Sequence, residues 1–299
     1  MEYRKHAAAH LGSGLVVLSS LVYASYGVWI KLLGNFLGDF TQAVLRGVLV
    51  ILLLLPVAIF RNKLSRIFWR RDAWLLIGLL ISNALISVPL FYSIKIIGVG
   101  LGLAVAYAGI VLGAFFFGRI FNGEVYTKDK VASTILGIMG LWLIFTPSTK
   151  IFGLLALLAA LISGLASGLN MVVNKKIKYS VLQTAILTWI GTVLANIPMI
   201  FILNESFPQI NSDIHWIYLL LFALASFISS WLLISGLKLI EAGTAGILGL
   251  LEIVFGVVLG IIFFKEHLTA VVTLGMTCII AAAAIPYVNQ YNNRKEVKV

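Results

Sequence analysis

The sequence LLEIVFGVVLGIIFFKEHLT, residues 250–269, is an apolar run with one acidic residue near its start, Glu252, and a second near its end, Glu266. It belongs to a longer segment, Leu237–Glu266, that repeats the design of Ile94–Glu124: an apolar, Gly- and Ala-rich run that ends at a glutamate. The two terminal glutamates lie 142 positions apart. A shared design at a fixed offset indicates that the chain contains two copies of one unit.

Proline positions support the same duplication. The offset that relates the glutamates also relates Pro56 to Pro198, and Pro147 and Pro286 close the two halves at nearly that spacing. We therefore interpret residues 1–149 and 150–299 as two five-helix units with a junction near Lys150. Two tandem units with an odd number of spans enter the bilayer in opposite orientations, and inverted repeats are typical of secondary transporters.

The composition independently predicts a membrane protein. Hydrophobic residues make up 61% of the chain and charged residues 11%, which is far from the balance of a soluble domain. Apolar runs of this length must be helical, because only helices and closed barrels satisfy their backbone groups in lipid. We expect an all-α polytopic membrane protein with ten transmembrane helices, arranged as two inverted five-helix repeats. The predicted spans are 12–33, 40–60, 73–93, 98–120, 129–147, 151–173, 183–203, 215–237, 242–264 and 268–288.

Lys and Arg residues are unevenly divided between the two sides that these spans define. With the N-terminus in the cytoplasm, the outer side receives four of them and the inner side seventeen, while Arg46 falls inside a span. This excess predicts a multi-pass protein of the plasma (inner) membrane with both termini cytoplasmic. It also explains the net charge of +11 without a nucleic-acid partner. The four outer residues are Lys31, Lys95, Lys150 and Lys265.

The residues resemble the ten-helix drug/metabolite transporter superfamily, specifically its EamA-type members. The resemblance covers essentially the whole chain and rests on Leu45-Arg46-Gly47, on FFFGRIFNGEVYT (residues 115–127) and on LLEIVFGVVLGIIFFKEHLT. It implies transport of metabolites, amino acids or drugs, commonly export, although the same architecture also serves uptake of nucleotide-linked compounds. The chain departs from the family where a proline often follows the mid-helix glutamate, because Ile253 stands there and Val111 occupies the equivalent place in the first half.

Glu252 lies near the centre of the ninth predicted span. A charge at that depth costs at least ~2.5–3.5 kcal/mol, so we expect a functional role: a partner for a substrate ammonium or a proton-coupling carboxylate. A protonated or paired Glu252 that locks helix packing is the alternative. For Glu124 and Glu266, which end apolar helices, we expect capping or ion pairs with Lys128 or Lys265. For Arg46 we favour a structural role in which the side chain extends to the headgroups.

Uncharged polar and aromatic residues outline a candidate substrate path, since small-molecule sites combine aromatic contact with a few hydrogen-bonding groups. We expect spans one, three, four, six, eight and nine to surround it, and spans five and ten to act as scaffold. Most of the individual serines are explained equally well by bonds to their own helix backbone. The candidate substrate-path residues are Tyr26, Trp29, Asn83, Tyr107, Asn170, Trp231 and Glu252, and Glu252 is also the candidate coupling residue.

Three classes of function are compatible with a polytopic membrane protein: a secondary carrier, a channel and a membrane-embedded enzyme. The favoured one is a secondary transporter that moves small organic metabolites, amino-acid-like or drug-like, by alternating access, with export as the expected direction. The alternative is an uptake or exchange carrier for nucleotide-linked or other metabolites, although phosphate groups favour several intramembrane Lys or Arg residues and only Arg46 qualifies. A channel is disfavoured because one buried glutamate does not make a polar pore ring.

A membrane-embedded enzyme would need an acid–base, nucleophilic or metal-binding group of residues inside the spans. The four histidines, however, all lie outside the predicted spans or at their edges. We therefore expect no catalytic activity, no cofactor and no metal site. The expected partners are a small-molecule substrate, the lipid bilayer and protons as a coupling ion.

Overall fold

The computed structural model describes residues 2–60, 73–145, 153–206 and 213–296. Within these ranges every element of regular secondary structure is a helix. The predicted junction near Lys150 lies outside the described residues, as do six of the inner basic residues: Arg61, Lys63, Arg66, Arg70, Arg71 and Lys298.

The two halves of the chain contribute equivalent sets of helices. The first half forms α1 (Glu2–Ala24), α2 (Tyr26–Leu33), α3 (Asp39–Phe60), α4 (Ala73–Ile97), α5 (Val99–Asn122) and α6 (Lys128–Ile144). The second half forms α7 (Leu154–Lys176), α8 (Val181–Ile202), α9 (Ile214–Leu237), α10 (Ala242–Gly249), α11 (Leu251–Phe264) and α12 (Ala270–Glu296).

These helices make ten membrane spans. Eight helical segments of the described chain are long and apolar enough to cross a bilayer, among them Ala7–Leu33 and Ala242–Phe264, which join α1 to α2 and α10 to α11. The 17-residue α6 and the apolar part of α12, Ala270–Ile285, complete the set. The prediction of an all-α polytopic membrane protein with ten helices is confirmed.

The ninth span is broken where the sequence predicts a continuous helix. The N–H of Leu250 donates to Ile247 O at 3.1 Å, and the N–H of Ile253 donates to Leu250 O at 3.0 Å. Each of these bonds joins a residue to the one three positions earlier, as in a tight turn. A regular α-helix instead joins residues four positions apart, so the helix is interrupted here. The equivalent helix of the first half, α5, is unbroken from Val99 to Asn122. The break places Glu252 in the first turn of α11.

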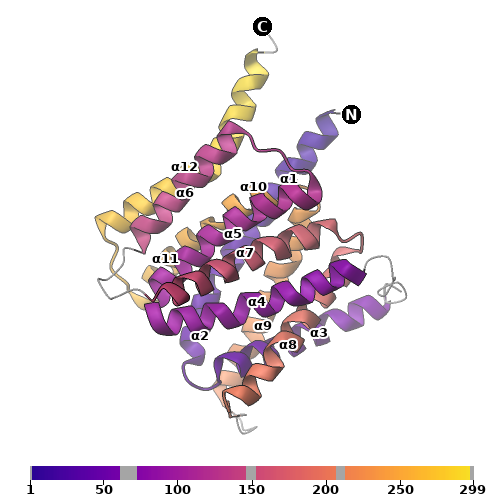
Figure 1. The fold of residues 1–299 in the computed structure, drawn as a ribbon, viewed down its shortest axis with the longest axis vertical. Helices are drawn as coiled ribbons and strands as arrows, with labels where there is room; N and C mark the ends of the chain where they lie inside the picture. The colour runs from indigo at the N-terminus through magenta and orange to yellow at the C-terminus, as the bar shows by residue number, and fades with distance from the viewer. Residues whose placement is uncertain (1, 61–72, 146–152, 207–212, 297–299) are drawn as a thin grey trace.

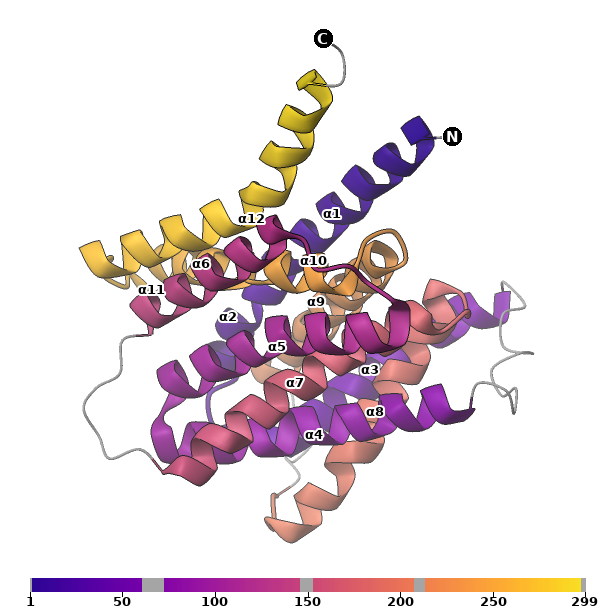
Figure 2. The same ribbon diagram turned by 45° about the horizontal axis from the view of Figure 1, so that its top comes forward.

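Glycines bring α5 and α7 into close contact. A Cβ atom on Gly109 would lie 3.0 Å from Gly164 Cα, and one on Gly113 would lie 2.8 Å from Leu165 O. Backbone atoms cannot move aside for such a group, so these positions require glycine. In both ribbon views α4, α7 and α5 lie side by side (Figures 1 and 2).

The paired helices α6 and α12 form one edge of the molecule (Figure 1). They also approach through glycine, because a Cβ atom on Gly140 would lie 2.7 Å from Gly275 O. The start of α1 and the end of α12 project from one side of the bundle (Figure 2). We call this side the terminal face and the other the opposite face. Since successive spans alternate in direction, the ends of α5 and α7 and the start of α10 lie at the terminal face.

Candidate substrate site

Glu252 lies where the start of α11 packs against the middle of α5. Tyr107, in the middle of α5, packs against this part of α11, and its hydroxyl approaches the carboxyl group of Glu252. The Glu252 side chain keeps part of its accessible surface, so it does not lie in a fully packed core.

Two glycines near Glu252 in the sequence face open space. Gly256 follows Glu252 by one turn of α11, so these two residues share one face, whereas Gly249 ends α10 on the other side of the break at Leu250. A Cβ atom added to either glycine would meet no atom within 4 Å. Open space therefore lies beside Glu252 on the face of α11 that carries Gly256.

Arg46, on α3, occupies another part of this region. Its guanidinium carbon lies 4.2 Å from the ring centroid of Phe222, 5.1 Å from that of Tyr26 and 5.7 Å from that of Trp189. Its Nε atom is buried and has no hydrogen-bond partner. The expected extension of Arg46 to the headgroups is not observed. Instead, aromatic rings from three other helices surround its guanidinium inside the bundle and stabilise the charge through cation–π contacts.

Two tyrosines connect these charged groups. The rings of Tyr23 and Tyr26 are 5.0 Å apart, and the Tyr26 hydroxyl lies 3.0 Å from Ser229 Oγ on α9. Tyr26 contacts Arg46, and α1, which carries Tyr23, packs against α11, which carries Glu252. Among the described residues, no ion pair includes Arg46 or Glu252. The site therefore contains a cation and an acidic group that are not paired with one another.

Asn83 and Asn170, both predicted for the path, belong to a separate polar cluster between α4, α7 and α8. Asn170 Nδ2 donates to Ser82 Oγ at 2.9 Å, and its Oδ1 accepts from Asn174 Nδ2 at 2.7 Å. Asn83 Nδ2 donates to Leu79 O at 2.8 Å, while its Oδ1 accepts from the Thr192 hydroxyl at 3.2 Å. Both amides are buried and hydrogen-bonded, which explains how the fold accommodates them.

The two predicted tryptophans lie near the site without contacting Glu252. Trp29 Nε1 donates to Ser25 Oγ at 3.1 Å, and the ring packs in the apolar cluster of Leu33 and Phe222. Trp231 packs against Phe227, with ring centroids 6.0 Å apart. Of the seven predicted path residues, the structure thus brings together Tyr26, Tyr107 and Glu252.

Sequence reasoning missed Phe222 and Trp189, which pack on Arg46. Nothing in the sequence distinguishes these two residues from other aromatic residues in apolar spans. Arg46 itself carried a signal, because it lies farther from the ends of its predicted span than any other Lys or Arg.

The terminal face is closed beside this site by Glu124. Its carboxylate accepts hydrogen bonds from the backbone N–H groups of Ala242 and Gly243, at 2.8 and 3.1 Å, and from Lys175 Nζ at 2.8 Å. Only 6% of Glu124 is exposed. The residue is a cap, as predicted, but it caps the first turn of a distant helix, α10, and its ion pair is with Lys175 rather than Lys128.

Further polar contacts surround Glu124. Lys130 pairs with Glu241, Lys176 Nζ donates to Phe121 O at 2.6 Å, and Lys238 donates to Ile177 O. At the opposite face, Glu266 pairs with Lys31 at 3.1 Å, and both side chains are more than half exposed. The two ends of the bundle are therefore closed to different extents.

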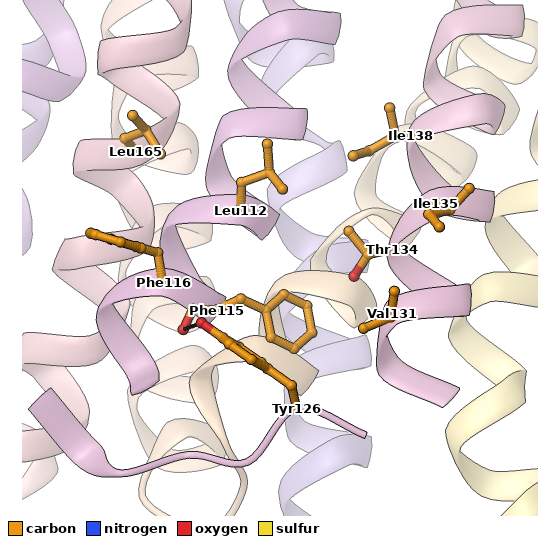
Figure 3. A pocket seen from close by; sticks show the side chains of 9 residues that line it. All are labelled: Leu112, Phe115, Phe116, Tyr126, Val131, Thr134, Ile135, Ile138 and Leu165. Carbon is orange, nitrogen blue, oxygen red and sulfur yellow. Dashed lines mark hydrogen bonds between the residues drawn. The ribbon is translucent and has the colours of Figure 1, made fainter. Parts of the chain in front are cut away.

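A second hollow lies on the outer surface between α5, α6 and α7, with a volume of about 660 Å³ (Figure 3). Several of its side chains are exposed, including Leu112, Phe116 and Ile135. An apolar hollow on the membrane-facing surface suits a lipid acyl chain better than a polar metabolite. It is lined by Leu112, Phe115, Phe116, Tyr126, Val131, Thr134, Ile135, Ile138 and Leu165.

Comparison with known proteins agrees with this architecture. A model of the EamA-like transporter family matches residues 10–146 and again residues 154–287. A solved structure, described as a crystal structure of a protein, has the same fold, with a TM-score of 0.78 at 14% identity over 94% of this chain and 97% of its own. No curated protein matches the chain.

The ten-helix fold and the twofold family match define a multi-pass membrane transporter of small molecules. The chain belongs to the EamA-like transporter family.

Proposed function

We propose that this protein is a secondary transporter that moves small organic metabolites, amino-acid-like or drug-like, through the space beside Glu252. Arg46, whose charge lies among aromatic rings, and Glu252 carry this proposal, because neither forms an ion pair among the described residues and charges inside a membrane protein are costly unless a partner or a ligand uses them. Hydrogen-bonding tyrosines and aromatic faces suit a small polar molecule.

Alternating access is the mechanism we propose. At the terminal face the Glu124–Lys175 pair is buried and caps α10, whereas the Glu266–Lys31 pair at the opposite face is exposed and Glu205 caps the start of α3 there. A transporter with inverted repeats alternates by exchanging the conformations of its two halves. We propose that this structure represents the state closed at the terminal face.

We further propose a plasma-membrane location, cytoplasmic termini, and export as the net direction. The excess of Lys and Arg on the terminal side supports the orientation. The terminal face is then the cytoplasmic face, and the space beside Glu252 is closed toward the cytoplasm in this structure. Protons are the proposed coupling ion, with Glu252 as the titrating carboxylate.

Reconstituted flux tests the proposal. A metabolite panel is first tested for thermal stabilisation of the purified protein, and the stabilising compounds are then used as radiolabelled substrates in proteoliposomes. We expect saturable uptake that the unlabelled compound inhibits and that a counter-loaded pool accelerates. Flux that rises linearly with concentration and shows no counterflow would instead indicate a passive channel.

A further inference from the structure

The outer hollow between α5, α6 and α7 has basic residues at its end on the terminal face. We propose that this hollow binds one acyl chain of an anionic phospholipid, and that Arg119 and Lys128 hold the phosphate of the same molecule. The inference concerns the membrane-facing surface, so it does not depend on which substrate the protein transports.

The interior of the hollow suits a hydrocarbon chain. Among the residues that line it, only Tyr126 and Thr134 carry polar side-chain groups. The Tyr126 hydroxyl donates to Phe115 O at 3.0 Å, and the Thr134 hydroxyl donates to Lys130 O at 2.8 Å (Figure 3). Both hydroxyl protons are therefore used within the protein. The volume of about 660 Å³ lies within the range of small-molecule sites, roughly 300–1,000 Å³, so the hollow is large enough for an apolar ligand.

The lining faces of α5 and α6 both continue to a basic residue. On α5 this face carries Leu112, Phe116 and then Arg119, at spacings of four and three residues. On α6 it carries Lys128 and then Val131, which lines the hollow. Since α5 ends and α6 begins at the terminal face, the two basic residues lie at the same end of the hollow. Both are exposed.

Arg119 has hydrogen-bond donors available for a ligand. Its guanidinium carbon lies 5.9 Å from the ring centroid of Tyr126, and its Nη1 donates to Glu124 O at 3.3 Å. A guanidinium has five N–H donors, and its planar fork matches the oxygens of a phosphate. Among the described residues, no ion pair includes Arg119 or Lys128. Together they offer two positive charges beside the ring that lines the hollow.

The acidic groups of this region do not cancel these charges. Glu124 pairs with Lys175, and Glu241 pairs with Lys130. Asp129 lies in the first turn of α6, where a helix favours an acidic residue, and successive residues of a helix do not share one face. The proposed orientation places the terminal face in the cytoplasmic leaflet. Basic pockets between helices on that side bind anionic headgroups.

Lipid titrations of the purified full-length protein, followed by native mass spectrometry, test the inference. The probes are palmitoyl-oleoyl phosphatidylglycerol and the phosphatidylcholine with the same two chains, which differ in the net charge of the headgroup. We expect the first phosphatidylglycerol molecule to bind about five- to twentyfold more tightly, because each basic residue contributes about fivefold toward an anionic headgroup.

Two substitutions test the headgroup contacts. Arg119→Gln and Lys128→Gln should each weaken binding of phosphatidylglycerol about fivefold and leave binding of phosphatidylcholine unchanged. Lys178→Gln removes an exposed charge from the same face, between α7 and α8, and is the matched control. It should change neither affinity. The melting temperature in detergent checks that each variant is folded.

A third substitution tests the position of the chain. Leu112→Trp fills the hollow and should weaken binding of both lipids, whereas Leu274→Trp, at an exposed position on α12, should weaken neither. Phosphatidylglycerol with a photoreactive group in its acyl chain should crosslink to α5 and α6 near Leu112 and Ile138.

Several outcomes would overturn the inference. These are equal affinity for the two lipids, an unchanged preference in both the Arg119 and the Lys128 variants, and crosslinks that lie elsewhere. If Leu112→Trp leaves lipid binding unchanged and converts a dimer into a monomer in the same spectra, the hollow is an interface between two copies of the chain. The lipid assignment then fails. Because no transported substrate is present, these results are separate from the test of the proposed transport function.

Discussion

Glu124 and Glu266 end equivalent helices of the two halves, yet only Glu124 is buried in contacts with the other half. Each carboxylate packs over a glycine of its own helix, Gly118 or Gly260, so the local structure is the same. Glu124 then caps the first turn of α10, whereas Glu266 remains at an exposed surface. Since the two local sites are alike, the difference comes from how the halves pack around them. At the opposite face it is Glu205, at the end of α8, that caps the start of α3 by accepting from the N–H groups of Phe40 and Thr41.

The buried contacts of Glu124 predict a stability difference. Glu124→Ala removes the acceptor for two backbone N–H groups of α10 and leaves Lys175 without its partner. Breaking a buried ion pair by removing one partner costs about 3–5 kcal/mol. We therefore expect a markedly lower melting temperature in detergent. Glu266→Ala is the matched control and should cost about 0–1 kcal/mol, because its ion pair is exposed.

Gly256 tests alternating access. The offset between the two repeats makes Ala114 the counterpart of Gly256. The Cβ of Ala114 lies 3.3 Å from the position that a Cβ on Gly246 would occupy, so the bundle is closely packed at Ala114. A Cβ on Gly256 meets nothing within 4 Å, so the side chain of Gly256→Leu begins in open space in this structure. If the opposite face closes during transport as the terminal face does here, the added side chain obstructs that closure. We expect flux to fall to background while the melting temperature stays the same or rises.

Gly27→Leu is the control for Gly256→Leu, because Gly27 is an exposed helical glycine that also faces open space. It should leave flux unchanged. Full activity of Gly256→Leu would show that the opposite face does not close at this point.

Lys238 predicts a pH dependence of stability. Burial lowers the pKa of Lys238 to about 8, from the ordinary value of 10.5 that the unfolded chain retains. Between these two values the unfolded state binds more protons than the folded state, so stability rises with pH across this window. Below pH of about 8 both states are protonated, and the cost of burying the charge is fully present.

The substitution Lys238→Met removes this cost. We expect it to raise the melting temperature relative to the unmodified protein at pH 7, and the difference should shrink as the pH approaches 10. A difference that stays constant across this range would show that Lys238 does not titrate there.

The proposed orientation has a direct test by chemical labelling. Cys278 is first replaced by serine, and a single cysteine is then introduced in place of Lys150. Because the charge distribution predicts cytoplasmic termini, an impermeant thiol reagent added outside intact cells should label this cysteine. A cysteine in place of Lys178, between α7 and α8, should be labelled only after the membrane is opened. The reverse pattern would invert the orientation, and with it the proposed direction of export.

The sequence was sufficient for the fold because ten apolar runs with short connections leave few other arrangements in a bilayer. Glu252 was recognised for a similar reason, since a single acidic group in an apolar run has a large energetic effect. The break at Leu250 could not be predicted, because no proline marks it.

The rest of the site depends on tertiary contacts. Phe222 and Trp189 resemble every other apolar side chain of their helices until Arg46 lies against them. Asn83 and Asn170 were candidates because amides are costly to bury in lipid, but hydroxyl groups on neighbouring helices remove that cost. Such pairings join residues far apart in the chain, and a single sequence does not reveal them.

Proton coupling at Glu252 is tested by Glu252→Gln in proteoliposomes. The amide keeps the size of the side chain and can still bond to Tyr107, but it cannot ionise. If the carboxylate carries the coupling proton, the variant should fold normally and lose flux driven by a pH gradient, while exchange between equal substrate pools persists.

Glu252→Ala should in addition lower the melting temperature, because it leaves a void beside an unsatisfied Tyr107 hydroxyl. If Glu252→Gln instead concentrates substrate in response to a pH gradient as the unmodified protein does, the coupling role is excluded. The protein would then work as a uniporter or an exchanger.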